Sequence, residues 1–179
     1  MEESYKGKFL IANSSIITDY FHNTVIFIVE HDRVGALGLV INKQLPQSIS
    51  DLIKGVPEKD LLMFSGGPVD GSFISILHDN ASLKDPGTEI IPGVFMGRSF
   101  ELLLSLIESN ARFRVFQGYS GWGSEQLEDE INRKSWAIVD GDPDMIYSSD
   151  ISGVWREALK RKGGIYRYFA EHTKDPMLN

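Results

Sequence analysis

Short runs of β-branched and aromatic residues dominate the first half of the chain, and Gly, Pro, Asp or Asn residues separate them. Such runs, bounded by turn-forming residues, are typical of strands. They predict strands at residues 9–12, 24–30, 36–41, 61–64 and 73–77. Because these strands are short and follow one another without long helical patterns between them, we expect antiparallel pairing.

The clearest hairpin covers residues 24–43, where two apolar runs flank a loop from His31 to Gly35. A loop of this length usually needs a glycine at a positive φ, and Gly35 can supply it. Within the first run, the residues from Val25 to Val29 are all apolar and do not alternate with polar ones. This strand is therefore expected to be covered on both faces, by helices or by a second sheet layer.

Four helical segments follow from capping residues and from apolar spacing. They are a short turn at residues 50–54, a helix that Ser99 caps and that ends near Asn110, a helix that Ser124 caps, and a helix at residues 151–162 that Gly163 and Gly164 end. Strands are predicted between them at residues 112–117 and 136–139. Helices and strands that mix without a regular βαβ alternation predict an α+β fold.

Composition narrows the class of protein. The chain has 179 residues, a formal net charge of −7 and no cysteine, so disulfides, thiol catalysis and thiolate metal sites are excluded. No linker or repeat divides the chain, which predicts a single domain over residues 1–179. The start carries two acidic residues and lacks an apolar leader segment, and no apolar run is long enough for a bilayer. We therefore expect a cytoplasmic protein without a membrane partner.

The glycine-rich segment from Gly118 to Gly123, GYSGWG, is the strongest local motif. Its spacing does not fit phosphate-binding loops, and the acidic residues that follow would repel an anion. We therefore expect a tight strand-to-helix turn that Trp122 anchors. The motif also resembles the nucleophile elbow of hydrolases, with Ser120 as nucleophile and His31 or His78 as base, but Trp122 occupies the position of its second glycine.

The four histidines are scattered and do not show the spacing of a metal centre. Glu30 and His31 are neighbours on a strand, so they face opposite sides unless a bulge intervenes. Asp32 is expected to bond its own backbone in the hairpin loop. His78 alternates with apolar residues, which favours a position at the rim of the core. We therefore predict no metal and no cofactor.

Several long motifs in a fixed order make the chain resemble the AlgH/YqgE family of small bacterial proteins. They are GKFLIA at residues 7–12, residues 21–30 leading into EHDRVGALGLVINK, then FSGGPV, ILH, GYSGWGSEQLEDEI with Trp136 after it, and the terminal PMLN. The chain departs from the family at Asn13-Ser14-Ser15, where a proline-containing turn is typical, and at Ser120, where alanine is common. The resemblance implies an α+β fold whose antiparallel, barrel-like sheet is flanked by about four helices. Because the family is described as a transcriptional regulator, the resemblance also implies this description for the chain.

Three functions are compatible with these residues. The leading hypothesis is a non-catalytic regulatory domain that binds a small molecule or a protein, because polar motif residues fall where the strands end. We expect three parts of the chain to border one hollow. They are the hairpin tip at residues 31–35, the double-glycine bend at Gly66 and Gly67, and the tryptophan corner at Trp122. The candidate ligand-binding residues are Glu30, His31, Asn42, Gly66, Gly67, His78, Trp122, Gln126 and Glu128.

The alternatives are a transcriptional regulator and a hydrolase. A regulator would act through a protein partner or through DNA, for which residues 150–174 offer six basic side chains against three acidic ones. The overall negative charge argues against nucleic acid as the main partner. A hydrolase of unknown substrate would use Ser120, or a carboxylate pair such as Glu30 and Glu128. Monomer and homodimer are equally compatible with the acidic surface.

Overall fold

One long strand, β9 (Phe113–Gly123), organises the sheet of this protein. Its first part lies between β5 (Leu62–Ser65) and β6 (Val69–His78), and its last part pairs with β3 (Gly35–Val40). The structure is a computed structural model that describes residues 3–13, 19–57 and 61–172. Ser14, Ser15, Lys174 and the terminal PMLN motif lie outside this range.

Eight strands follow one another across the sheet in the order β10-β1-β2-β3-β9-β6-β8-β7. Strand β5 pairs with β9 outside this order, and β4 pairs with β5. All pairings within the described residues are antiparallel except that of β5 with β9, which is parallel. The remaining strands are β1 (Lys8–Ala12), β2 (Val25–Asp32), β4 (Gln44–Ser48), β7 (Thr88–Ile91), β8 (Val94–Gly97) and β10 (Trp136–Asp140).

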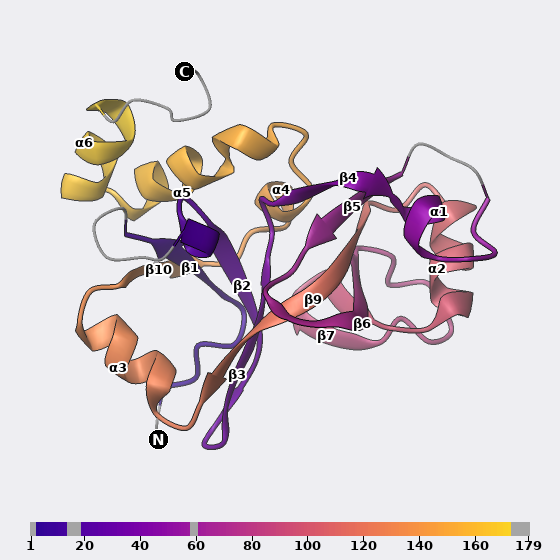
Figure 1. Cartoon of the computed structure of the whole chain (residues 1–179), viewed down its shortest axis with the longest axis horizontal. Helices are drawn as coiled ribbons and strands as arrows, with labels where there is room; N and C mark the ends of the chain where they lie inside the picture. The colour runs from indigo at the N-terminus through magenta and orange to yellow at the C-terminus, as the bar shows by residue number, and fades with distance from the viewer. Residues whose placement is uncertain (1–2, 14–18, 58–60, 173–179) are drawn as a thin grey trace.

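The helices cover both faces of this curled sheet (Figure 1). On one face of β1 and β2, α5 packs with α6, while α3 covers the opposite face together with Trp122 and Trp136. The short α1 and the longer α2 cover the half built from β5, β6 and β9. The helices are α1 (Ile49–Leu52), α2 (Phe100–Ile107), α3 (Gln126–Asn132), α4 (Pro143–Ile146), α5 (Val154–Lys162) and α6 (Ile165–His172), and 3-10 turns span Asp19–Phe21 and Ile151–Gly153.

Strand β2 is buried on both faces, as its unbroken apolar run predicts. Val25, Phe27 and Val29 belong to the core under α5, whereas Ile26 and Ile28 belong to the core under α3. All five side chains are fully buried. A strand with two covered faces has no need of polar alternation, so the sequence pattern follows from the two helical layers.

A β-bulge at Val29 reverses the alternation of β2 just before the hairpin tip. Ile28 pairs with Gly38, but the next paired residues are Glu30 with Leu37 and His31 with Ala36. Residues directly opposite on paired strands share a face. Because Ala36 packs on the α3 side of the sheet, the bulge turns His31 toward α3, and simple alternation would have turned it away.

The predicted fold class is confirmed: the protein is a mixed α+β fold with an antiparallel, curled half-barrel sheet and four helices of seven residues or more in the described chain. Three strands were not predicted, namely β4, β7 and β8. The short helix α4, which Asp142 caps and Pro143 begins, was not predicted. Helix α6 was also not predicted. Among the described residues, no helix has the length and the hydrophobicity to cross a membrane.

The glycine-rich segment is a strand and not a turn, so this prediction was wrong. Residues Gly118 to Gly123 continue β9, and the last four of them pair with β3. The glycines allow a close approach of neighbouring backbone: a Cβ on Gly118 would lie 2.6 Å from the carbonyl oxygen of Gly67. The prediction was wrong because it took the high glycine content as a sign of a turn. In the structure the glycines are small residues that let neighbouring backbone approach β9 closely.

Candidate functional site

His31 and Glu128 meet although 97 residues separate them in the chain. His31 lies near the tip of the β2–β3 hairpin, and Glu128 lies in the first turn of α3. The Nε2 atom of His31 is 2.6 Å from Oε1 of Glu128. The bulge at Val29 makes this contact possible because it places His31 on the face that α3 covers.

The other ring nitrogen of His31 determines its tautomer. The backbone N–H of Tyr5 donates to Nδ1 of His31 over 3.0 Å, so Nδ1 accepts and carries no proton. Nε2 therefore carries the proton and donates to the carboxylate of Glu128. The imidazole is neutral and uses both nitrogens, and its side chain is only 7% exposed. It has no free lone pair with which to accept a proton from a substrate.

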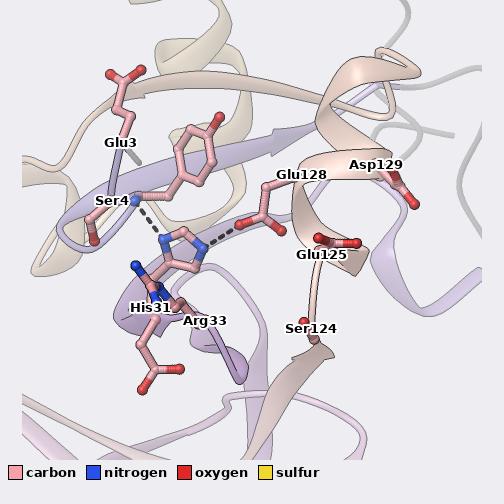
Figure 2. A pocket seen from close by; sticks show the side chains of 10 residues that line it. Glu3, Ser4, His31, Arg33, Ser124, Glu125, Glu128 and Asp129 are labelled. Atoms are coloured by element: carbon pink, nitrogen blue, oxygen red, sulfur yellow. Dashed lines mark hydrogen bonds and ion pairs between the residues drawn. The ribbon is translucent and has the colours of Figure 1, made fainter. Parts of the chain in front are cut away.

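A half-open hollow of about 950 Å³ lies beside this pair (Figure 2). The N-terminal segment forms one wall, the hairpin tip the second, and the start of α3 the third. Five carboxylates and one guanidinium line it, which gives it a negative potential. The lining residues are Glu3, Ser4, Tyr5, His31, Asp32, Arg33, Ser124, Glu125, Glu128 and Asp129.

The start of α3 is built by backbone conformation. Ser124 was predicted to cap this helix, but Glu125 occupies the cap position in the left-handed region with a φ of 62°, and its side chain makes no capping bond. Gln126 takes part instead, since its Oε1 accepts from the backbone N–H of Gly123 over 3.0 Å. The acids in the first turn, Glu128 and Asp129, lie where the helix dipole favours negative charge.

The family model described as AlgH-like matches residues 9–167. The chain belongs to the AlgH-like family. It is 32% identical over 177 residues to a UPF0301 protein of Chlorobaculum tepidum, across 97% of this chain and 95% of that protein. It is 34% identical over 180 residues to a UPF0301 protein of Cytophaga hutchinsonii, across 97% of this chain and 98% of that protein. The resemblance inferred from the motifs is therefore confirmed.

Two solved structures share the AlgH-like fold. The solution structure of the AlgH protein from Pseudomonas aeruginosa superposes with a TM-score of 0.76 at 24% identity, over 97% of this chain and 99% of that one. The crystal structure of protein DIP2367 from Corynebacterium diphtheriae gives a TM-score of 0.79 at 19% identity, over 95% and 93%. At these identities the two likenesses establish the fold alone.

Of the nine candidate ligand-binding residues, His31 and Glu128 line the hollow. Trp122 and Gln126 support it from behind: Trp122 is buried in the core under α3, and Gln126 holds the end of β9 to the helix. Glu30 pairs with Leu37, which packs on the opposite face of the sheet, and it does not line the hollow. The bulge therefore separates Glu30 from His31 and Glu128.

Asn42 and the two glycines of the FSGGPV motif have structural positions away from the hollow. Asn42 accepts from the backbone N–H of Val25 over 2.9 Å and donates to the carbonyl of Asn23 over 2.8 Å. Gly66 and Gly67 pass against β9, where an added Cβ would come within 2.4 Å and 2.1 Å of backbone atoms. The expected shared border between the double-glycine bend and the hairpin tip is thus not formed.

His78 lies at the far end of β9 from the hollow, where it pairs with Phe113. Its side chain is buried, which agrees with a histidine in the core. Nδ1 accepts from the backbone N–H of Asn80 over 3.2 Å, and Nε2 therefore donates to the carbonyl of Pro86 over 2.6 Å. Burial lowers the pKa of His78, against the opposing effects of the Pro86 carbonyl and Asp79.

Ser120 does not have the surroundings of a nucleophile. Its side chain is 1% exposed, and its hydroxyl donates to the backbone carbonyl of Gly66 over 3.2 Å. Neither His31 nor His78 bonds to it, since both rings have other partners. Within residues 3–13, 19–57 and 61–172, no group of three or more His, Asp or Glu side chains is placed to hold a metal ion.

The basic residues of the C-terminal region are largely engaged with their own chain. Arg161 pairs with Asp142 and Glu157, Lys162 donates to the carbonyl of Ile138, and Arg156 donates to the carbonyl of Ala170. These contacts attach α5 to its neighbours. DNA binding by this region stays an untested alternative, which the overall negative charge already disfavoured.

Sequence reasoning missed most of the lining of the hollow. Tyr5 takes part through its backbone N–H, which carries no side-chain signal. Glu130 was also missed, although it accepts from the indole N–H groups of Trp122 and Trp136 over 2.9 and 2.8 Å. Its i, i+4 spacing from Gln126, which donates to it over 3.1 Å, is the signal that was available.

Proposed function

We propose that this AlgH-like protein is a non-catalytic binding domain that recognises a positively charged group of a partner at the hollow between the N-terminal segment, the hairpin tip and α3. The observation that carries this proposal is the lining of the hollow, where five carboxylates face one guanidinium. A cation 4 Å from one carboxylate gains about 1 kcal/mol in bulk water and about 4 kcal/mol near a protein surface. Several carboxylates around one hollow add to this attraction.

The state of His31 argues against catalysis at the same place. General base catalysis needs a lone pair within hydrogen-bond reach of the substrate. In His31 the Nδ1 lone pair accepts from Tyr5 and the Nε2 proton goes to Glu128. The contacts of His31 therefore hold the N-terminal segment, the β2–β3 hairpin and α3 together, which suits a preformed binding surface.

NMR titration tests this proposal. Tetralysine and spermidine are added to the ¹⁵N-labelled protein, with tetraglutamate as the anionic control, and the amide signals of Tyr5, Arg33 and Glu125 report on the hollow. We expect saturable shifts at these residues with the two cations only. The affinity should fall several-fold between 20 and 200 mM salt, because salt screens exposed charges.

A pair of matched charge reversals makes the test specific. Asp129 and Glu101 are both exposed acids in the first turn of a helix, but only Asp129 lines the hollow. Asp129→Lys should weaken tetralysine binding about tenfold or more, while Glu101→Lys should leave it nearly unchanged. Equal effects of the two reversals, or shifts spread over the whole surface, would contradict the proposal.

A further inference from the structure

The outer face of α6 carries three large apolar side chains that are exposed. Ile165, Tyr168 and Phe169 are 63%, 57% and 46% exposed. Because Tyr168 and Phe169 follow Ile165 by three and four residues, all three lie on one side of the helix. Tyr166 and Ala170 lie on the other side, where they pack on the core under α5. A contiguous exposed apolar stripe of this kind marks an interaction surface.

The charged side chains near this stripe are mostly basic. Lys160 and Lys162 lie in the last turn of α5, and Arg167 lies on α6 itself. Within the described chain, none of these three cations pairs with a carboxylate, so their positive charges are not compensated. The sequence of α6 contains one acid, Glu171. The stripe therefore suits a partner that offers an apolar contact together with several negative charges.

The hollow between the N-terminal segment, the hairpin tip and α3 has these complementary features. Asp32, Glu125 and Asp129 line it with exposed carboxylates. Val34 follows Arg33 at the hairpin tip, and this apolar side chain is 81% exposed. Negative charges and an exposed apolar side chain thus lie together here, as positive charges and apolar side chains do on α6. Two surfaces of opposite charge on one chain favour contact between copies of that chain.

The two surfaces lie on different faces of the sheet. Helix α6 packs with α5 on one face of β1 and β2, whereas α3 covers the opposite face (Figure 1). A contact between α6 of one copy and the hollow of another is therefore head to tail. Such a contact leaves one α6 and one hollow free at the two ends, so further copies can be added.

We infer that this protein associates with itself head to tail, with α6 of one copy bound at the hollow of the next. Lys160, Lys162 and Arg167 face the carboxylates of the hollow, and the apolar stripe of α6 packs against Val34. The inference rests on the proposed function, because it names a second copy of this chain as the partner whose positive charges the hollow recognises. The contact is small and partly electrostatic, so it forms at high protein concentration and low salt.

Sedimentation analysis between about 20 µM and about 1 mM protein tests this inference. We expect the average mass of the wild type to rise beyond that of a dimer at 20 mM salt and to fall toward that of the monomer at 200 mM salt. Asp129→Lys damages the hollow, and Ile165→Ser combined with Tyr168→Ser damages α6, so each variant should stay monomeric. A one-to-one mixture of the two should form dimers and nothing larger, since each pair holds one intact hollow and one intact α6.

Two control variants lie outside both surfaces. Glu101→Lys changes the net charge as much as Asp129→Lys does, and Phe100→Ser removes an exposed apolar side chain from α2. Both controls should associate as the wild type does. A loss of association in these controls equal to that in the damaged variants would overturn the inference.

Other outcomes separate this inference from the proposed function. A wild type that stays monomeric at about 1 mM protein and low salt overturns the inference, while the proposed function stands if tetralysine still binds at the hollow. Association that survives in both damaged variants, or a mixture that stays monomeric, also overturns it. Binding of monomers to phosphatidylglycerol vesicles through α6, without self-association, would assign the stripe to a membrane and would overturn it as well.

Discussion

Trp122 and Trp136 share one acceptor: Oε2 of Glu130 accepts from both indole N–H groups, over 2.9 and 2.8 Å. The two rings pack edge to face with centroids 6.3 Å apart. Trp122 closes the end of β9 and Trp136 begins β10, so one carboxylate on α3 joins two strands that are not neighbours in the sheet. This contact fixes α3, and with it one wall of the acidic hollow.

Glu130→Ala should lower the free energy of unfolding by about 2–4 kcal/mol, because two buried indole donors lose a charged acceptor. Urea unfolding followed by tryptophan fluorescence measures this loss. Glu130→Gln keeps an acceptor oxygen and should cost about 1 kcal/mol. Asp129→Ala on the same helix removes an exposed side chain and should change stability by less than about 0.5 kcal/mol. A similar loss in Asp129→Ala and Glu130→Ala would contradict the assigned role.

His78 should make the protein less stable in mild acid. Burial lowers its folded-state pKa below the unfolded value of about 6.5, so the unfolded state binds the proton more readily. Its contribution is complete above about pH 6.5 and is lost as the pH falls from there toward the lowered pKa. One such proton changes the free energy of unfolding by at most about 1.4 kcal/mol per pH unit.

Urea unfolding at a series of pH values between 7.5 and 5 measures this dependence. His78→Gln should be less stable than the wild type at pH 7.5, because Asn80 and Pro86 lose the ring that links them. The difference between the two proteins should shrink as the pH falls. A constant difference across the range would show that His78 titrates alike in both states.

Gly67→Ala should destabilise the protein by about 3 kcal/mol or more. An added Cβ would lie 2.1 Å from the backbone carbonyl of Tyr119, and backbone in a paired strand cannot move aside without breaking the sheet. Gly71→Ala is the matched control, since its Cβ would meet only the side-chain amide of Gln117 at 3.9 Å. Thermal unfolding of both variants measures the contrast, and a comparable loss in each would refute it.

His31→Phe should release the N-terminal wall of the hollow. The variant cannot accept from the backbone N–H of Tyr5, so exchange of that amide with solvent should speed up about three- to tenfold. Amide exchange followed by NMR measures this rate. Tyr5→Phe keeps the backbone bond and should leave the rate unchanged. An unchanged rate in His31→Phe would mean that other contacts hold the segment.

The sequence predicted the fold better than the site, and β2 and α4 show why. The unbroken apolar run of β2 reports directly on burial, so both its strand character and its two covered faces were predicted. Helix α4 was missed although Asp142 and Pro143 form a recognisable helix start, because the following residues have β propensity. Strand β4 was missed because Pro46 lies within it, and proline is tolerated only at a sheet edge.

The site was predicted only partly. Its residues are brought together by three-dimensional geometry, which their spacing along the sequence does not encode. His31 and Glu128 were both chosen as polar residues at strand ends, and they do line one hollow. Asn42 and His78 were chosen by the same reasoning, yet each satisfies backbone groups within the fold. Polar residues that cap strand ends and polar residues that meet a ligand have the same appearance in a single sequence.

The extra residue at Val29 has a consequence for how related chains should be compared. Consider a chain with the same Glu-His-Asp residues at its hairpin but without the β-bulge before them. Its histidine would face the layer that contains α5, and the residue equivalent to Glu128 would have no partner. Identical residues at the hairpin tip are therefore weak evidence that another chain has the same acidic hollow. The length of the strand between its last paired apolar residue and the histidine is the feature to inspect.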